Sequence, residues 1–133
     1  MGCPCAAFLQ VKEVLKSGSE CLGGVRQKVT VLFSDIRDFT SISEAMDAAD
    51  LVAMLNEYFG TQINPILENH GVLDKFIGDA IMATFGVPFS HGTDTRRACT
   101  TALQMIQQLA KFNTARAAQG YVQRQGPLVF DHC

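Results

Sequence analysis

The chain has 133 residues, enough for one domain with an ordinary hydrophobic core. Its 11 basic and 13 acidic residues give a formal net charge of −2, which excludes a protein that binds nucleic acid through a basic stripe. No apolar run reaches the ~20 residues of a membrane span, so we expect no transmembrane segment. The five cysteines are odd in number and include no CxxC pair, which predicts reduced thiols in a cytoplasmic protein.

The pattern of hydrophobic residues divides the chain into three parts. Residues 1–24 are interrupted by glycine and serine and predict an irregular leader. Residues 25–118 alternate between apolar runs and helical periods and predict the folded domain. Residues 119–133 show no period and predict a divergent tail, with no helix or strand in residues 121–133.

The domain begins with a strand that leads into a helix. The β-branched and apolar run 29–33 predicts a buried strand that ends at Ser34 and Asp35. Ser41 and Glu44 have the spacing of a capping box, which predicts that a helix begins at Ser41.

A helical period covers residues 47–69, where Pro65 is expected to kink the helix or open its last turn and Gly71 to end it. A last helix is expected after the cap formed by Thr93 and Asp94. The expected buried stripes are Leu51, Leu55, Tyr58, Phe59, Ile63 and Ile66 in the first helix, and Ala98, Ala102, Met105, Ile106, Leu109 and Phe112 in the second.

Between these helices, the apolar runs 72–77 and 80–85 predict two strands of a hairpin, because only Gly78 and Asp79 separate them. The predicted order βααββα indicates an α+β fold of the ferredoxin-like, split βαβ type, incomplete because the later strands are missing. A strand–helix–strand crossover makes the first two strands parallel, and the hairpin then places the third strand beside the first.

This topology predicts that two carboxylates meet. Asp35 ends the first strand and Asp79 precedes the third, so both are expected at one edge of the sheet. Two neighbouring carboxylates repel each other unless a cation lies between them, and oxygen ligands suit Mg²⁺ or Mn²⁺. Either aspartate alone reads more simply as a turn residue. The turn over residues 36–40 leads into a helix N-terminus, which is typical of a phosphate-binding position or of a helix that simply starts there.

Two sequence blocks resemble the signatures of class III adenylate and guanylate cyclase catalytic domains. They are residues 31–40, VLFSDIRDFT, and residues 74–83, DKFIGDAIMA. The resemblance covers roughly residues 22–118, and the sequence of the blocks is most similar to the bacterial and cyanobacterial adenylate cyclases. It implies that Asp35, Asp79 and the backbone carbonyl of Ile36 ligate two divalent ions, and that Phe39 and Thr40 present the turn to the triphosphate.

The resemblance also places Lys75 at the position that contacts the purine, where guanylate cyclases characteristically carry an acidic residue. Because lysine only donates hydrogen bonds and adenine N1 accepts them, Lys75 favours ATP. Without the resemblance, a solvated lysine on an edge strand would be preferred. The implied reaction is attack of the ribose 3′-hydroxyl on the α-phosphorus, which yields 3′,5′-cyclic AMP and pyrophosphate.

The resemblance stops before the family's glycine-rich strand and its Asn and Arg, which complete the site of the partner chain in a dimer. The sequence therefore looks C-terminally truncated, and we expect this chain alone to be inactive and to work as a homodimer or as a heterodimer with a complete cyclase domain. Two alternatives stay open: a guanylate cyclase, and a non-catalytic dimerising module that binds ATP or a complete cyclase. A polymerase-palm or diguanylate-cyclase relative would share the topology but lacks these blocks.

Overall fold

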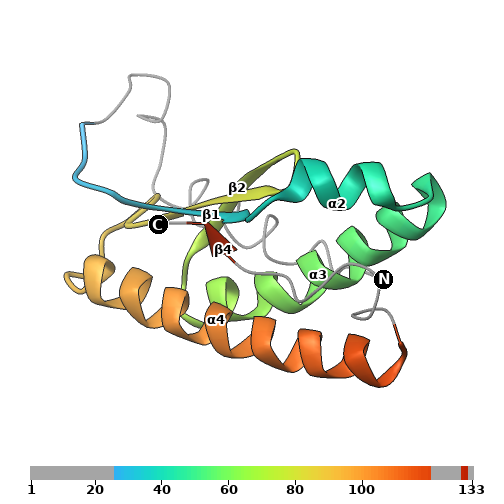
Figure 1. Ribbon diagram of the computed structural model, residues 1–133. Helices are drawn as coiled ribbons and strands as arrows, with labels where there is room; N and C mark the ends of the chain where they lie inside the picture. The colour runs from blue at the N-terminus through green and yellow to red at the C-terminus, as the bar shows by residue number, and fades with distance from the viewer. Residues whose placement is uncertain (1–25, 121–129, 132–133) are drawn as a thin grey trace.

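The computed structural model describes residues 26–120 and 130–131. The predicted leader and residues 121–129 and 132–133 of the predicted tail lie outside these ranges. The elements in chain order are β1 (Thr30–Ile36), α2 (Phe39–Ala45), α3 (Ala48–Glu68), β2 (Val72–Ile77), β3 (Ala80–Phe85), α4 (Asp94–Ala118) and β4 (Phe130–Asp131). Figure 1 shows a sheet in one layer with α3 and α4 beneath it.

The strand order in the sheet is β2-β3-β1-β4. Because β3 runs antiparallel to both β1 and β2, the strands β1 and β2 are parallel, as the crossover predicts. This order confirms the predicted ferredoxin-like α+β fold. β4 pairs with β1 antiparallel, in the position of a fourth ferredoxin strand. The prediction of no element in residues 121–133 is therefore wrong for residues 130–131, because this short strand forms by pairing with the open edge of β1 rather than by local sequence pattern.

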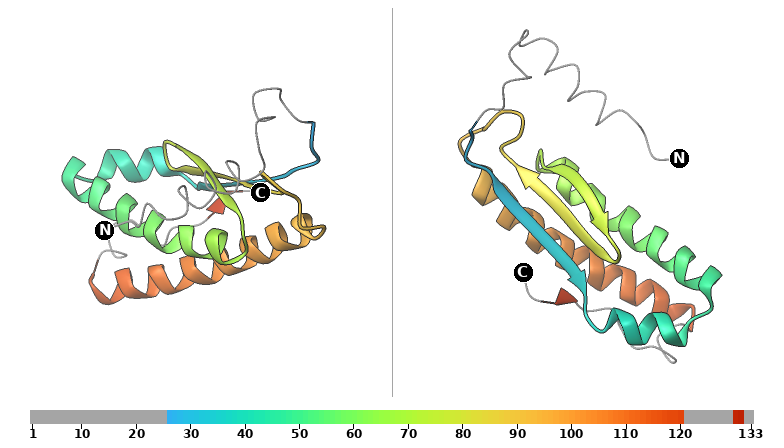
Figure 2. Two further views of the ribbon diagram at one scale, coloured as in Figure 1. Left: turned by 180° about the vertical axis from the view of Figure 1, so that it is seen from behind. Right: turned by 90° about the horizontal axis from the view of Figure 1, so that it is seen from above.

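The helices α3 and α4 cover one face of the sheet and make the core with it. The buried apolar side chains are Leu32, Ile36, Ile42, Met54, Tyr58, Ile66, Ile81, Ala83, Phe85, Ala98, Met105, Leu109 and Phe112. Seen from above in Figure 2, the strands lie in front of the helices, and no described helix covers the near side. Among the described residues, neither long helix has the length and apolar character that crossing a membrane requires.

The first strand and helix meet at a tighter turn than the sequence predicts. β1 continues to Ile36, so the strand is one residue longer than predicted and Asp35 is its last residue but one. α2 begins at Phe39 instead of Ser41, and its first residue follows Asp38, which has a left-handed backbone (φ 55°) and no side-chain cap. The capping box is wrong because the bond from the Ile42 N–H to the Asp38 carbonyl, at 3.1 Å, already starts the helix.

The predicted stripes are confirmed only in part. Tyr58 and Ile66 of α3 are fully buried, but so is Gln62, which the stripe omitted. Ile106 of α4 is 52% exposed, so its predicted burial is wrong. α3 continues through Pro65 to Glu68.

The end of α3 uses glycine for a different reason from the one predicted. The left-handed position after the helix is occupied by His70 (φ 57°). The N–H of Gly71 then donates to the Ile66 carbonyl at 2.8 Å and closes the last turn. A Cβ on Gly71 would lie 2.7 Å from the Phe85 ring, so this glycine permits close packing of the chain against β3.

Candidate active site

Two carboxylates meet where β1 ends and β3 begins. The backbone N–H of Ile36 donates to Asp35 Oδ1 at 2.9 Å and to Asp79 Oδ2 at 3.1 Å. The antiparallel register pairs Ser34 with Ile81, which brings the next residues of β1 alongside the hairpin turn that contains Asp79. The predicted convergence of Asp35 and Asp79 is thus present, with one backbone amide shared between them.

The electrostatics of this pair favour a positive charge. Burial, and next the hydrogen bond with Asp35, raises the pKa of the Asp79 carboxyl from 3.8 to about 6, although the Ile36 amide opposes this shift. A cation beside the two carboxylates would favour their ionised forms and oppose this shift.

The donor set suits a hard divalent cation. Carboxylate and carbonyl oxygens are the ligands that Mg²⁺ and Mn²⁺ prefer. Within residues 26–120 and 130–131, no group of three or more His, Cys, Asp or Glu side chains gathers to bind a metal. A cation here would therefore take few ligands from the described chain and the rest from water or phosphate. Such coordination is typical of Mg²⁺, whereas zinc usually takes three or four protein ligands.

A buried tyrosine lies close to the two aspartates. Burial raises the pKa of the Tyr58 phenol above its usual value; a hydrogen bond with Ser34 lowers it, and the charges of Asp79 and Asp35 raise it. The sequence predicts Tyr58 only as a core residue of α3. The sequence feature that could have linked Tyr58 to the site is Ser34, because it is a polar residue at an inward-facing position of β1, where an apolar residue is expected.

The two turn residues predicted to face the triphosphate sit at the start of α2. Thr40 is exposed, whereas Phe39 is half-buried and packs against the core. Only two residues separate Ile36 from Phe39, and Thr40 follows directly, so both lie close in the chain to the two carboxylates. Their contact with phosphate stays a prediction.

Lys75 is not brought into contact with the aspartates within one chain. It pairs with Met82 of β3, which pairs in turn with Phe33 of β1. Two strand spacings, about 10 Å, therefore separate Lys75 from β1. Its side chain is 60% exposed and forms an ion pair with Asp74 at 3.3 Å.

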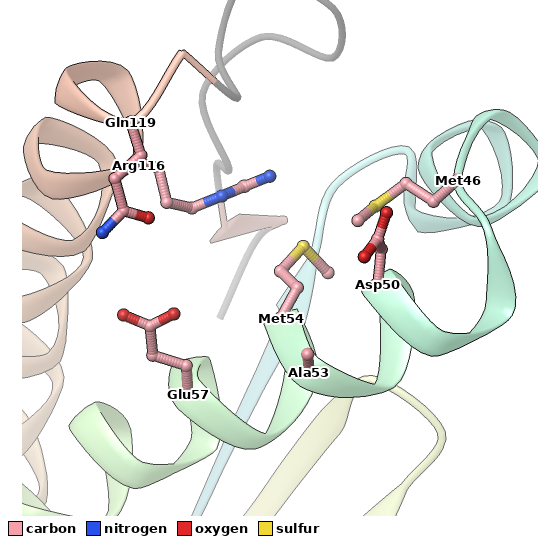
Figure 3. A pocket seen from close by; sticks show the side chains of 7 residues that line it. All are labelled: Met46, Asp50, Ala53, Met54, Glu57, Arg116 and Gln119. Carbon is pink, nitrogen blue, oxygen red and sulfur yellow. The ribbon is translucent and has the colours of Figure 1, made fainter.

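A small cavity lies between α3 and the end of α4, away from the predicted site residues. Its volume is about 90 Å³. None of the predicted site residues lines it, namely Asp35, Ile36, Phe39, Thr40, Lys75 and Asp79. Figure 3 shows the buried Arg116 reaching from α4 into this space, with Glu57 and Asp50 on α3. The Arg116 guanidinium also lies 5.6 Å from the centre of the Phe112 ring, which precedes it by four residues in the same helix.

The carboxylate pair predicts how stability depends on pH without divalent ions. Because the folded-state pKa of Asp79 is raised, this group favours folding when protonated, and that contribution is lost as pH rises from about 4 through about 6. Asp79→Asn removes the loss, so we expect it to raise the free energy of unfolding at pH 7.5 by about 1 kcal/mol, since solvent screens this partly exposed pair. Urea unfolding at pH 4 and pH 7.5 in EDTA measures the difference.

Asp94→Asn is the control of opposite sign. The hydrogen bond from Ser90 is the main cause that lowers the pKa of Asp94, so its ionised form stabilises the fold and this contribution is lost as pH falls. We therefore expect this variant to be less stable than the parent at pH 7.5. If Asp79→Asn brings no gain at pH 7.5, the pKa of Asp79 is not raised in the folded chain.

Comparison with known proteins agrees with this geometry. The family described as "Adenylate and Guanylate cyclase catalytic domain" matches residues 24–124. Adenylate cyclase 1 of Rhizobium meliloti is 37% identical over 114 residues, covering 82% of this chain and 17% of the relative. The adenylate cyclase of Anabaena cylindrica is 42% identical over 93 residues, covering 70% of this chain and 18% of the relative.

A solved structure, that of the guanylyl cyclase Cya2, superposes with a TM-score of 0.74 and 36% identity, over 81% of this chain and 53% of that one. The chain thus spans less than a fifth of the length of these two curated relatives and about half of this solved domain. With the sheet order and the paired aspartates, these matches establish that the chain belongs to the adenylate and guanylate cyclase catalytic domain family.

Proposed function

We propose that this chain is the metal-binding part of an adenylate cyclase, which converts ATP to 3′,5′-cyclic AMP and pyrophosphate in cyclic-nucleotide signalling. The observation that carries this proposal is the convergence of Asp35 and Asp79 on the Ile36 amide, where β1 and β3 lie side by side. The reduced cysteines expected from the sequence, of which Cys99 is free and exposed, suit a cytoplasmic domain.

The carboxylates of Asp35 and Asp79, with the carbonyl of Ile36, are the groups that would hold two Mg²⁺ or Mn²⁺ ions. When bound, these ions supply positive charge that favours ionisation of the ribose 3′-hydroxyl and neutralises the phosphates. The chain's own part is to fix the oxygen ligands at the end of β1 and in the turn before β3, where the sheet keeps them in place before substrate arrives. Phe39 and Thr40 carry the backbone of the turn that faces the phosphates.

A nucleotide that contacts both Lys75 and the carboxylates has to bridge about 10 Å or lie between two copies. Dimerisation is the simpler arrangement, because the sheet face without helices carries exposed apolar side chains, among them Val31 at 43% and Phe33 at 49%. We therefore infer that the domain works as a homodimer or as a heterodimer with a complete cyclase domain.

The relatives do not decide between adenine and guanine, because two of them are named adenylate cyclases and one solved structure is a guanylyl cyclase. We therefore assign the base from the chemistry of Lys75. An ammonium donor suits the N1 acceptor of adenine, whereas guanine presents an N1–H donor there. Lys75→Glu is expected to lower the ratio of ATP to GTP affinity about tenfold, since a polar mismatch costs about 1–3 kcal/mol. Titration calorimetry with each nucleotide and Mn²⁺ measures this ratio, and an unchanged ratio would return Lys75 to a solvated edge position.

A guanylate cyclase remains the alternative enzyme, and a higher affinity for GTP in the parent chain would favour it. A non-catalytic module that binds ATP or a complete cyclase is the alternative of a different class. Nucleotide binding without product, also in the presence of a complementary cyclase domain, would support the module.

A further inference from the structure

Two histidines from different turns lie side by side at one end of the sheet. The ring centres of His70 and His91 are 5.8 Å apart, and the ring planes are inclined by 31°. Both residues are exposed, so their ring nitrogens are accessible from solvent. His70 follows the end of α3 and His91 precedes α4, so the fold rather than the local sequence brings the two imidazoles together.

The β2–β3 hairpin explains why these two turns meet. Val72 at the start of β2 pairs with Thr84 near the end of β3. The turn that carries His70 leads into β2, and the loop that carries His91 follows β3, so both lie at the end of the hairpin away from Asp79. Strands of the length of β3 span about 17–20 Å. The imidazoles are therefore separate from the candidate site at the two carboxylates.

Hydrogen bonds hold the backbone of each histidine in place. The His70 N–H donates to a carbonyl of the last turn of α3 at 3.0 Å. The His91 N–H donates to Asp94 Oδ1 at 3.3 Å, in the first turn of α4. The side chain of Asn69 also donates to Gln104 Oε1 of α4 at 2.5 Å, which ties the turn after α3 to this helix. Fixed backbones limit the positions of the two rings, and such preorganisation favours the binding of a shared ligand.

The separation of the rings suits one shared metal ion. A tetrahedral ion that binds one nitrogen of each imidazole at about 2.0–2.1 Å puts the ring centres about 5 Å apart. The observed 5.8 Å is close to this value, so a small rotation of either side chain closes the pair around an ion. Imidazole suits Zn²⁺, Cu²⁺ and Ni²⁺, whereas Mg²⁺ prefers oxygen ligands. The nearby Asp94 carboxylate already accepts from Ser90 and Arg97, which leaves the remaining ligand positions to water.

We propose that His70 and His91 together bind a divalent transition-metal ion of the Ni²⁺, Cu²⁺ or Zn²⁺ type, with water completing its coordination. This site is independent of the proposed function. The ion joins the turn after α3 to the loop before α4, and it stabilises the folded chain because only the folded chain brings the two imidazoles together. With two protein ligands the ion is exposed and exchangeable, unlike the closed centres of structural zinc sites.

The test uses the full chain with its thiols capped by iodoacetamide and with excess Mg²⁺ to occupy the carboxylates. Titration calorimetry measures the affinity for Ni²⁺. The ring-proton NMR signals of the chain's three histidines show which of them bind, because this paramagnetic ion broadens the signals of its ligands. His70→Asn introduces a residue that tolerates the left-handed backbone (φ 57°). His91→Gln removes the second ligand, and His132→Gln is the matched control at the third histidine, which lies outside the described residues.

We expect one Ni²⁺ per chain, with the signals of His70 and His91 broadened over the same range of ion concentration. Either His70→Asn or His91→Gln should lower the Ni²⁺ affinity at least about tenfold, since even the loss of a partner of a metal ligand costs about 10–100-fold. His132→Gln should bind like the parent. Ni²⁺ should raise the urea midpoint of the parent and of His132→Gln, but not that of the other two variants.

Two outcomes would overturn the proposal. Single variants that bind Ni²⁺ as tightly as the parent, or signals that broaden at different ion concentrations, would show that the two rings act separately. A loss of affinity in His132→Gln alone would place the ion elsewhere in the chain. Urea unfolding without metal establishes that each variant folds, and His91→Gln, in an exposed loop, decides the test if His70→Asn does not fold.

Discussion

Replacing either Asp35 or Asp79 by alanine is expected to abolish Mn²⁺-dependent nucleotide binding while the fold persists. The two carboxylates share the Ile36 amide and provide the charged oxygen ligands of the proposed site. Removal of one leaves a single carboxylate, too weak a set for a divalent ion that prefers several oxygens. Loss of even an indirect partner of a metal ligand costs about 10–100-fold in affinity, so the loss of a ligand should exceed 100-fold.

The measurement is calorimetric titration of ATP with Mn²⁺ and again with EDTA. Glu44→Ala is a suitable control, because it removes one exposed acid from α2 and leaves the carboxylate pair intact. Circular dichroism establishes that each variant keeps its helices. Single variants that bind Mn²⁺·ATP as tightly as the parent would show that the aspartates form a turn contact and no metal site.

The strand order and the meeting of the aspartates were predictable because both follow from chain topology. A crossover followed by a two-residue hairpin places the second hairpin strand beside the first strand of the chain, and β3 lies beside β1 in the structure. The Gly78 backbone (φ 63°) shows that the hairpin signal was also correct in chemistry. These predictions depend on apolar runs and on a glycine in a turn, and the local conformations that such residues favour are also the ones in the folded protein.

The features that were missed depend on contacts between distant segments. The pairing of β2 with β3 shifts its register between Leu73 and Lys75, which leaves Asp74 as an extra residue in β2, and no single strand pattern reveals this shift. β4 depends in the same way on a free edge of β1. α2 starts at Phe39 because Asp38 adopts a left-handed backbone, and the capping pattern at Ser41 does not mark the start of the helix. The sequence placed Lys75 and the two aspartates on one sheet, but the distance between Lys75 and β1 follows only from the register of the strands.

A polypeptide of these 133 residues is expected to form no measurable cyclic AMP alone, even with Mn²⁺ and at high concentration. By the family resemblance, the reaction needs an Asn and an Arg that stabilise charge in the transition state, and none of these residues matches them. One missing preorganised donor typically costs about 10²–10³ in rate, so the absence of two leaves binding without turnover. On the proposed function, the chain would supply the complementary half: the carboxylates of Asp35 and Asp79, beside an open sheet face that a second domain can cover.

Activity is therefore expected to return when the chain is mixed with a cyclase domain that keeps the later segment but carries Ala at both of its metal aspartates. Each heterodimer then contains one site with metal ligands from this chain and the Asn and Arg from its partner. Cyclic AMP is measured for each component, for the mixture, and for a mixture with Asp35→Ala, which should be silent. Robust product from the short chain alone would contradict the division of the site between two chains. A silent mixture, with the heterodimer established by sedimentation, would favour the non-catalytic module, because both halves of the site would then be present without turnover.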